Sequence, residues 1–390
     1  MTRAVRPAAY VLDVDVTEPL PEVPGTDRVW VLVRYATEPI GALLLDPGTD
    51  LAGAIEDALG ERIRAAVDPR PRRAEVVASG PPLTVVVCTR DRPRSLARCL
   101  ESLLAQEYRR FRVLVVDNAP RDEAVRDVVR SLAGQRIPVE RLVVPRPGLS
   151  RARNAAVAAA PGETLAWIDD DEVADRYWLD GIARALLDHP GADAVAGPVA
   201  PAELATEAQL WCEEFGGLTK GRGYQPAVFT AATHDPLFPL PPFGSGANLT
   251  TRPGALAAIG DFDTALGAGT PASASEDTLA LTRLLRAGGT IVYQPGALTW
   301  HYHRRDLDGL RRQLTGYGTG LTAAYTALVL RHPSVVPGLV RLAPRALREV
   351  LRGGVRTASI GPDFPPELLR ANRRGMLRGP VAYLRGRWRP

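Results

Sequence analysis

From residue 83 onward, short apolar runs alternate with amphipathic stretches, and no other feature of the sequence constrains the fold as strongly. Leu83–Cys88 has the pattern of a buried strand, and Arg94–Gln106 repeats apolar residues at helical spacing. Further strands are predicted at Arg112–Val116, Arg141–Val144, Thr164–Ile168 and Ala194–Ala196, and further helices at Asp122–Leu132, Ser150–Ala160 and Tyr177–Leu187. Repeated strand–helix–strand units form a parallel sheet with right-handed crossovers. We therefore predict an α/β fold in which helices flank a mostly parallel sheet.

Polar clusters follow three of the predicted strands. They are Thr89-Arg90-Asp91-Arg92, Asp117-Asn118 and Asp169-Asp170-Asp171. Ligands of open parallel sheets bind beyond the carboxyl ends of the strands. The three clusters therefore predict a binding site at that edge of the sheet.

The acidic run at the end of the strand Thr164–Ile168 suggests a metal site. Side chains two residues apart in an extended segment share a face, so Asp169 and Asp171 can converge while Asp170 turns away. Converging carboxylate oxygens suit a hard cation such as Mg²⁺ or Mn²⁺, which is commonly shared with phosphate oxygens. A short acidic run is also compatible with a solvated loop.

Other polar residues allow two interpretations each. Asp117 either hydrogen-bonds a nucleobase or ribose or closes an Asx turn. Glu276-Asp277 either supplies a general base from a mobile loop or places carboxylates at the positive end of a helix. His301 and His303 lie two residues apart on an extended segment and are either metal ligands or structural histidines.

The segments outside the alternating region suggest three units. Residues 1–80 are predicted to form a small α+β domain that ends in a proline-rich linker, and residues 81–320 the α/β domain. Residues 321–390 are predicted to be helical and arginine-rich. Within the α/β domain, the segment Pro201–Phe243 is rich in proline and aromatic residues and reads as an irregular insertion.

Composition bears on location and partners. Three scattered cysteines give no disulfide framework, no signal peptide is recognisable and no apolar stretch reaches the length of a membrane span, so a cytoplasmic location is predicted.

Residues 331–390 hold thirteen arginines against three acidic residues. A stripe from Val336 to Leu351, with arginines around it, either lies on an anionic membrane or packs on the α/β domain. Pro337 and Pro344, expected to interrupt a helix, favour packing. No nucleic-acid partner is expected.

Seven motifs occur in an order that resembles the family 2 glycosyltransferases, over roughly residues 83–320. They are Cys88-Thr89-Arg90-Asp91-Arg92-Pro93, Val116-Asp117-Asn118, Gly148–Asn154, Asp169-Asp170-Asp171, Gly246-Ala247-Asn248, Glu276-Asp277 and His301-Tyr302-His303. The resemblance implies a GT-A fold, which is Rossmann-like. It also implies an inverting transfer of sugar from a nucleotide-diphosphate sugar, commonly a UDP-sugar, to a hydroxyl acceptor, with Mn²⁺ or Mg²⁺ as cofactor.

The resemblance also implies roles for individual residues. Asp277 would be the catalytic base, and Asp171 with His301 or His303 would bind the metal. Glu276 and Asn248 would support the site. Residues implied to contact the nucleotide sugar are Thr89, Arg90, Asp91, Asp117, Arg151, Asn154, Asp169 and Asp170.

Two departures from the family pattern bear on the predicted mode of transfer and on the predicted nucleotide base. Processive polysaccharide synthases of the family carry Q-x-x-R-W after the base, whereas this chain has Gln313-Leu314-Thr315-Gly316-Tyr317, so non-processive transfer is predicted. Asp117-Asn118-Ala119-Pro120 replaces the common D-D-G-S, which leaves the preferred base open. The alternatives are a sugar nucleotidyltransferase, which would need a glycine-rich loop after its first strand, and a non-catalytic adaptor that binds membrane or nucleic acid through its arginine-rich tail.

Overall fold

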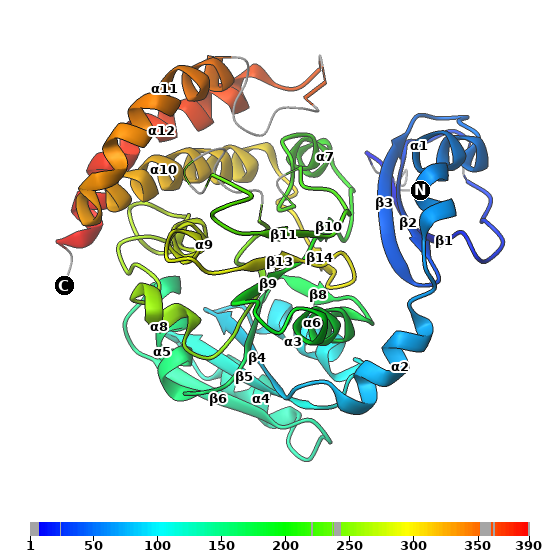
Figure 1. The fold of residues 1–390 in the computed structure, drawn as a ribbon, viewed down its shortest axis with the longest axis horizontal. Coiled ribbons are helices and arrows are strands. Elements are labelled where there is room, and N and C mark those ends of the chain that lie inside the picture. Colours follow the sequence, from blue (N-terminus) through cyan, green and yellow to red (C-terminus); the bar gives the residue numbers. More distant parts are fainter. Residues whose placement is uncertain are drawn as a thin grey trace, which may run out of the picture.

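An eight-stranded sheet forms the centre of the protein (Figure 1). The computed structural model describes residues 8–23, 25–219, 221–235, 237, 243–351, 360–361 and 363–388. The strand order is β11-β13-β9-β12-β7-β4-β5-β6. The strands are β4 (Leu83–Thr89), β5 (Phe111–Asn118), β6 (Val139–Val144), β7 (Leu165–Asp169), β9 (Ala194–Ala196), β11 (Ala227–Phe229), β12 (Asn248–Thr251) and β13 (Ile291–Tyr293).

Most neighbouring strands of this sheet are parallel, as predicted. Strand β4 pairs in parallel with both β5 and β7, and Thr89 at its end lies beside Asp117 of β5. Strand β12 runs antiparallel to both β7 and β9, and β11 runs antiparallel to β13. The predicted α/β class with flanking helices is confirmed, and the carboxyl ends of β4, β5 and β7 meet at one edge.

Helices cover both faces of the sheet because alternate strand residues point to opposite sides. Val85 and Val87 face a core that includes α3 and α6, whereas Val86 and Trp167 face a core that includes α5, α8 and α9. These helices and α4 are α3 (Pro93–Leu104), α4 (Ala124–Ser131), α5 (Leu149–Ala159), α6 (Trp178–Asp188), α8 (Ala255–Ile259) and α9 (Glu276–Arg286). The near-continuous apolar character of β4 and β5 follows from burial on both sides.

A second, three-stranded sheet was not predicted. It consists of β10 (Val199–Pro201), β14 (Thr299–His301) and β8 (Glu172–Ala174), in that order. Each strand has three residues, which is too short for a periodic signal in sequence. The antiparallel pairing of β14 with β8 places His301 opposite Glu172, directly after the acidic run.

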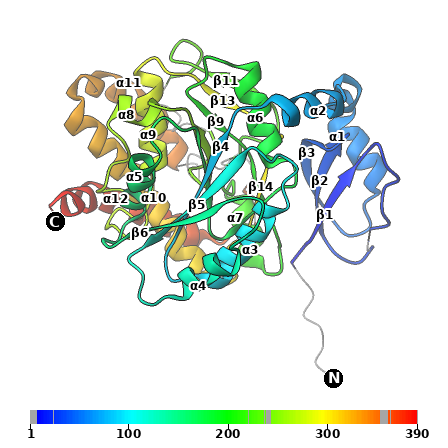
Figure 2. The same cartoon turned by 90° about the horizontal axis from the view of Figure 1, so that it is seen from below.

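The amino-terminal unit is an independent small sheet packed against the main domain (Figures 1 and 2). It contains β1 (Tyr10–Asp15), β2 (Val29–Tyr35), β3 (Glu38–Leu45) and α1 (Leu51–Ala65). Helix α1 covers one face of this sheet, and Trp30 and Leu32 on the other face contact Leu298 of the main domain. Arg34 bridges the two units through a buried ion pair with Asp175 at 2.6 Å.

The segment predicted as a linker is largely helical. Helix α2 (Arg70–Ser79) begins directly after Pro69 and has Pro71 in its first turn, where a missing N–H group costs nothing. Its Arg73 lies 3.5 Å from Asp180 of α6, so tertiary contacts stabilise a helix that proline content had argued against. The predicted linker is therefore helical over most of its length.

The carboxyl-terminal region is helical, as predicted, and begins with a long helix. The helices are α10 (Leu307–Arg331), α11 (Val336–Leu351) and α12 (Pro366–Arg387), with α7 (Glu207–Glu214) near the start of α10. The predicted domain boundary at residues 320 and 321 falls inside α10, so the three-unit division stays a proposal. No helix among the described residues is long and apolar enough to cross a membrane.

Helices α10 and α12 approach each other closely through glycine. A Cβ atom added at Gly375 would lie 2.1 Å from the carbonyl oxygen of Thr315, and one added at Gly318 would lie 2.0 Å from that of Asn372. Gly379 lies similarly close to Thr322. These contacts hold the two backbones together over two turns.

We expect Gly375→Ala to lower the free energy of unfolding by about 1–3 kcal/mol, because the added methyl group overpacks the contact between α10 and α12. Gly191→Ala is the matched control, since nothing lies within 4 Å of a Cβ atom added there. Chemical denaturation of both variants checks the difference. Equal stability of the two variants would contradict the close contact.

Helix α11 continues through both prolines. Pro337 lies in the first turn, where proline is tolerated, and Pro344 lies inside the helix. The prediction that these prolines interrupt the helix was therefore wrong. Leu339 packs on the core formed with α9 and α10, whereas Val340 and Leu347 are exposed. The end of the predicted stripe, from Val350, lies outside the described side chains, and contact of this helix with a membrane stays a prediction.

Candidate active site

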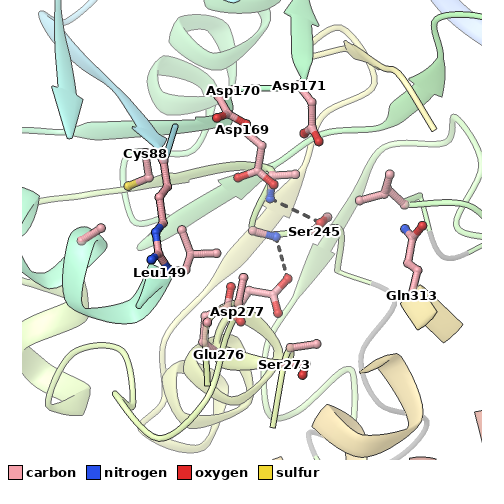
Figure 3. Close-up of a pocket in the computed structure, with 18 of the residues that line it drawn as sticks. Cys88, Leu149, Asp169, Asp170, Asp171, Ser245, Ser273, Glu276, Asp277 and Gln313 are labelled. Atoms are coloured by element: carbon pink, nitrogen blue, oxygen red, sulfur yellow. Dashed lines mark hydrogen bonds between the residues drawn. The ribbon is translucent and has the colours of Figure 1, made fainter. Parts of the chain in front are cut away.

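A cavity of about 810 Å³ opens at the carboxyl ends of β4 and β7. Figure 3 shows Asp169, Asp170 and Asp171 on one side of it and Glu276 and Asp277 on another. The acidic run follows β7, and the pair at 276 and 277 starts α9. The predicted site residues that line the cavity are Thr89, Arg90, Asp169, Asp170, Asp171, Glu276, Asp277 and His301.

Within the acidic run, Asp170 is held by neighbours. It accepts hydrogen bonds from Thr89 Oγ1 at 2.6 Å and from Arg92 Nη1 at 3.0 Å. The same Arg92 nitrogen lies 3.0 Å from Asp171 Oδ2. Asp170 therefore anchors the turn to β4, and Arg92, which was not predicted as a site residue, offsets the charge of the run.

The other two carboxylates have different electrostatic surroundings. Burial and the neighbouring Asp171 raise the pKa of Asp169 to about 6, although Arg153 opposes the shift. Burial also acts on Asp171, but the hydrogen bond from His301 and the charge of Arg92 hold the pKa of that carboxyl well below its usual range. Asp171 is therefore the more firmly ionised of the two.

His301 belongs to a chain of polar side chains that leads away from the cavity. Its Nε2 atom lies 3.4 Å from Asp171 Oδ1, and its Nδ1 atom lies 2.8 Å from Nδ1 of His303. His303 Nε2 in turn lies 2.7 Å from Glu213 Oε1 on α7. The contact with Glu213 fixes the orientation of the His303 ring, and the contact between the two Nδ1 atoms in turn fixes the ring of His301. Nε2 is therefore the atom of His301 that faces Asp171.

Asp171 and His301 fit a divalent cation as two of its ligands. A carboxylate oxygen suits Mn²⁺ or Mg²⁺, and an imidazole nitrogen suits a transition metal such as Mn²⁺ better than it suits Mg²⁺; the other positions of either cation are commonly filled by water and phosphate oxygens. Over the described part of the chain, no group of three or more His, Cys, Asp or Glu side chains is arranged to hold a metal ion. The pair is therefore suited to a cation that arrives with a phosphate ligand.

Asp277 lies in the first turn of α9 and faces the cavity (Figure 3). Its Oδ2 atom accepts a hydrogen bond from the backbone N–H of Gly246 at 2.7 Å, and its Oδ1 atom accepts one from that of Thr278 at 2.6 Å. Ser275 before the helix has a left-handed backbone with φ of 71°. This turn directs the first residues of α9 at the cavity.

Arg153 was missed as a site residue, although it lines the cavity. Its side chain is buried, and it donates to Glu276 Oε1 at 2.8 Å and to the carbonyl oxygen of Gly246 at 2.9 Å. It also lies 3.4 Å from Asp169 Oδ1. Burial raises the pKa of Glu276, and the charge of Arg153 opposes that shift. Arg153 thus joins three of the motifs.

Four predicted nucleotide-binding residues do not line the cavity. Asp91 lies 3.2 Å from Arg121, and Arg151 lies along the backbone of Gly148. Asn154 exchanges two hydrogen bonds with the backbone of Phe262, at 2.9 and 3.0 Å, and so ties α5 to the loop after α8. The fourth, Asp117, is fully buried and forms an ion pair with Arg141 at 2.6 Å.

The two supporting residues outside the cavity have structural partners. Asn248 accepts from Trp178 Nε1 at 2.9 Å and donates to the carbonyl oxygens of Pro198 and Ala297. All three groups belong to backbone or core, so Asn248 holds strand ends together. His303 lies against His301, which lines the cavity.

Known proteins resemble this chain over most of its length. Residues 84–259 match the model of the family described as glycosyl transferase family 2. The succinoglycan biosynthesis protein ExoM of Rhizobium meliloti is 30% identical over 72% of this chain and 93% of its own length. The pre-mycofactocin glycosyltransferase of Mycobacterium tuberculosis is 27% identical over 66% of this chain, which spans only 50% of that relative. The chain therefore belongs to glycosyltransferase family 2, and the predicted family and the predicted glycosyltransferase activity are confirmed.

Two solved structures resemble this chain, and one of them is described as a mannosyltransferase. The mannosyltransferase PcManGT from Pyrobaculum calidifontis, solved with GDP-Man and Mn²⁺, is 19% identical over 86% of this chain and 85% of its own, with a TM-score of 0.48. TarS 1-349 of S. aureus, solved with UDP-GlcNAc, is 15% identical over 76% of this chain and 91% of its own, with a TM-score of 0.44. Both scores are below 0.5, so the family assignment rests on sequence likeness.

Proposed function

We propose that this chain is an inverting, divalent-metal-dependent glycosyltransferase that moves a sugar from a UDP-sugar to a hydroxyl acceptor, without processive addition. The observation that carries the proposal is the arrangement of carboxylates in one cavity. Asp169 and Asp171 come from the end of β7, and Asp277 comes from the start of α9. The carboxylates after β7 are suited to bind the diphosphate and its cation. The carboxylate of Asp277 is suited to accept a proton from the acceptor hydroxyl.

In the proposed reaction, Asp277 takes the proton of the acceptor hydroxyl as its oxygen attacks the anomeric carbon. The bond from that carbon to the nucleoside diphosphate breaks in the same step, so a single displacement inverts the configuration. A bound divalent cation supplies Lewis-acid stabilisation of the leaving diphosphate. Arg90, Arg92 and Arg304 line the same cavity and place positive charge where the diphosphate leaves.

The environment of Asp117 supports the choice of uracil as the base of the donor. Its Oδ2 atom is paired with Arg141, whereas its Oδ1 atom is buried and has no hydrogen-bond partner among the described residues. A buried unpaired oxygen is costly and is suited to an N–H donor from a ligand. Asp117 lies beside Thr89 in the sheet, and Thr89 lines the cavity. Uracil offers such an N–H group on its pairing edge.

Product analysis tests the proposal. The purified chain is incubated with a panel of UDP-, GDP- and TDP-sugars, Mn²⁺ and simple hydroxyl acceptors, and the anomeric configuration of each product is determined by NMR. We expect turnover of a UDP-sugar and a product inverted relative to the donor. A product that retains the configuration, or turnover confined to another nucleotide, would overturn the corresponding part of the proposal.

The contact between Glu213 and His303 predicts an effect on metal affinity. Because Glu213 fixes the orientation of the His303 ring and thereby that of His301, we expect Glu213→Ala to weaken Mn²⁺ binding by about 10–100-fold. Calorimetric titration of Mn²⁺ in the presence of UDP measures the effect directly. Glu214→Ala, the next residue on α7, is the matched control, and equal Mn²⁺ affinity in both variants would exclude this role.

A further inference from the structure

A second cavity, of about 740 Å³, adjoins the active site between α10 and α12. Ser273 and Arg312 line both cavities. Ser273 belongs to the loop that leads into α9, four residues before Asp277. A molecule in the second cavity therefore lies next to the part of the active site that holds the proposed base.

The second cavity is lined by five arginines, and we call it the arginine groove. Arg311 pairs with Asp308 at 2.9 Å. The other four form no ion pair with any described residue, and they come from α10 and α12: Arg312, Arg374, Arg378 and Arg385. Like charges that lie one helical turn apart repel one another. Four arginines without an ion-pair partner among the described residues are therefore suited to an anionic ligand.

Close packing of the two helices holds this charge in place. Gly318 of α10 and Gly375 and Gly379 of α12 bring the backbones into contact beneath the groove. The carbonyl oxygen of Leu314 also accepts a hydrogen bond from Asn372 Nδ2 at 2.9 Å. Close packing therefore keeps the arginines near one another. Without it, the helices could separate and relieve the repulsion between these charges.

The groove also has an apolar side. Leu377 and Val381 of α12 line it and are 83% and 52% exposed. Trp388, which follows α12, is 80% exposed. No aromatic side chain is found among the described residues that line the groove, whereas single-stranded nucleic acids are commonly bound by stacking on aromatic rings. Arginines beside exposed aliphatic side chains match an amphiphile that carries phosphate next to hydrocarbon.

We propose that the arginine groove binds the phosphate headgroup of a membrane lipid, with Leu377 and Val381 against its hydrocarbon. The acceptor hydroxyl is then presented to Asp277 from a lipid-linked molecule at a membrane surface. The assignment of the acceptor rests on the proposed function, whereas the lipid-binding site does not. Phosphate oxygens are good partners for arginine because the guanidinium group can donate two parallel hydrogen bonds.

The test is binding of the full chain to lipid vesicles in the absence of donor and metal. We expect binding to phosphatidylcholine vesicles that contain phosphatidic acid and no binding to phosphatidylcholine alone. The double variant Arg374→Gln/Arg378→Gln should bind about 30-fold more weakly, since each arginine near an anionic surface contributes roughly a factor of five. Arg130→Gln/Arg136→Gln removes the same charge outside the groove and should bind like wild type.

Other outcomes would overturn the inference. Equal loss in the Arg130/Arg136 control would indicate unspecific charge attraction, and loss confined to Arg341→Gln/Arg348→Gln would place the contact on α11. Full competition by inorganic phosphate, at the phosphate concentration of the vesicles, would indicate a site for soluble phosphates. Tighter binding of single-stranded RNA that depends on Arg374 and Arg378 would indicate a nucleic-acid site.

Donor hydrolysis, measured with UDP-sugar and Mn²⁺ in parallel, separates this inference from the proposed function. If the wild-type chain hydrolyses the donor but does not bind vesicles with phosphatidic acid, the proposed function is retained and the lipid site is excluded. If it binds these vesicles through the groove but does not turn over the donor, the lipid site is retained and the proposed function is excluded.

Discussion

Replacing Asp277 by Asn should reduce the rate of sugar transfer by roughly 10²–10⁴-fold, which is the usual contribution of a general base. The amide oxygen can still accept the hydrogen bond from the Gly246 N–H, and only the one from the Thr278 N–H is lost, so the start of α9 should keep its position. The amide cannot take a proton from the acceptor. We therefore expect transfer to collapse while UDP binding, measured separately by calorimetry, stays near that of wild type.

The control for this variant is Asp308→Asn. Asp308 lies in the first turn of α10, is exposed and pairs with Arg311, so the same chemical change there should leave transfer unchanged. Glu276→Gln is not a suitable control, because Glu276 is buried and paired with Arg153. Near wild-type transfer by Asp277→Asn would show that another carboxylate acts as the base.

Removal of divalent cations should abolish transfer, and added Mn²⁺ or Mg²⁺ should restore it. The physical reason is that Asp171 and His301 supply only two ligands, so the cation is held firmly only when diphosphate oxygens complete its shell. Mn²⁺ should accordingly increase the affinity of wild type for UDP. Asp171→Asn should lose both the increase in UDP affinity and the restoration of transfer.

The stability of Asp171→Asn needs a separate measurement, because Asp171 also offsets the charge of Arg92. Asp170 remains as a partner for that guanidinium, so we expect the sheet to stay folded, as circular dichroism and thermal denaturation would report. Full transfer by wild type in excess chelator would contradict metal dependence and would assign the acidic run to a metal-free reaction.

Local patterns in the sequence were sufficient to predict the central sheet and its functional edge. The runs at Leu83–Cys88 and Thr164–Ile168 became β4 and β7, and the acidic residues after the second run line the cavity. Asp277 and His301 also reach that cavity. Period-two and helical spacings are properties of neighbouring residues, so they can be read without knowledge of the fold.

The arginines of α5 show the limit of local reasoning. The motif predicted Arg151 and Asn154 as ligand contacts, whereas Arg153 lines the cavity. Each residue along a helix turns the side chain by about 100°, so neighbours in one motif face different surroundings. The direction of a helix relative to the sheet decides which of them reaches the site, and no single-sequence pattern reports that direction.

Sequence alone therefore determined the α/β class, the order of its main elements and the chemical types gathered at the strand ends. Only the tertiary structure decided which side chains meet. The short strands β8 and β14 bring His301 to Asp171, and α7 supplies Glu213 from far along the chain. Glycine contacts between α10 and α12 assemble the arginine groove. These arrangements depend on long-range packing and backbone approach, which arise only when distant segments of the chain come together.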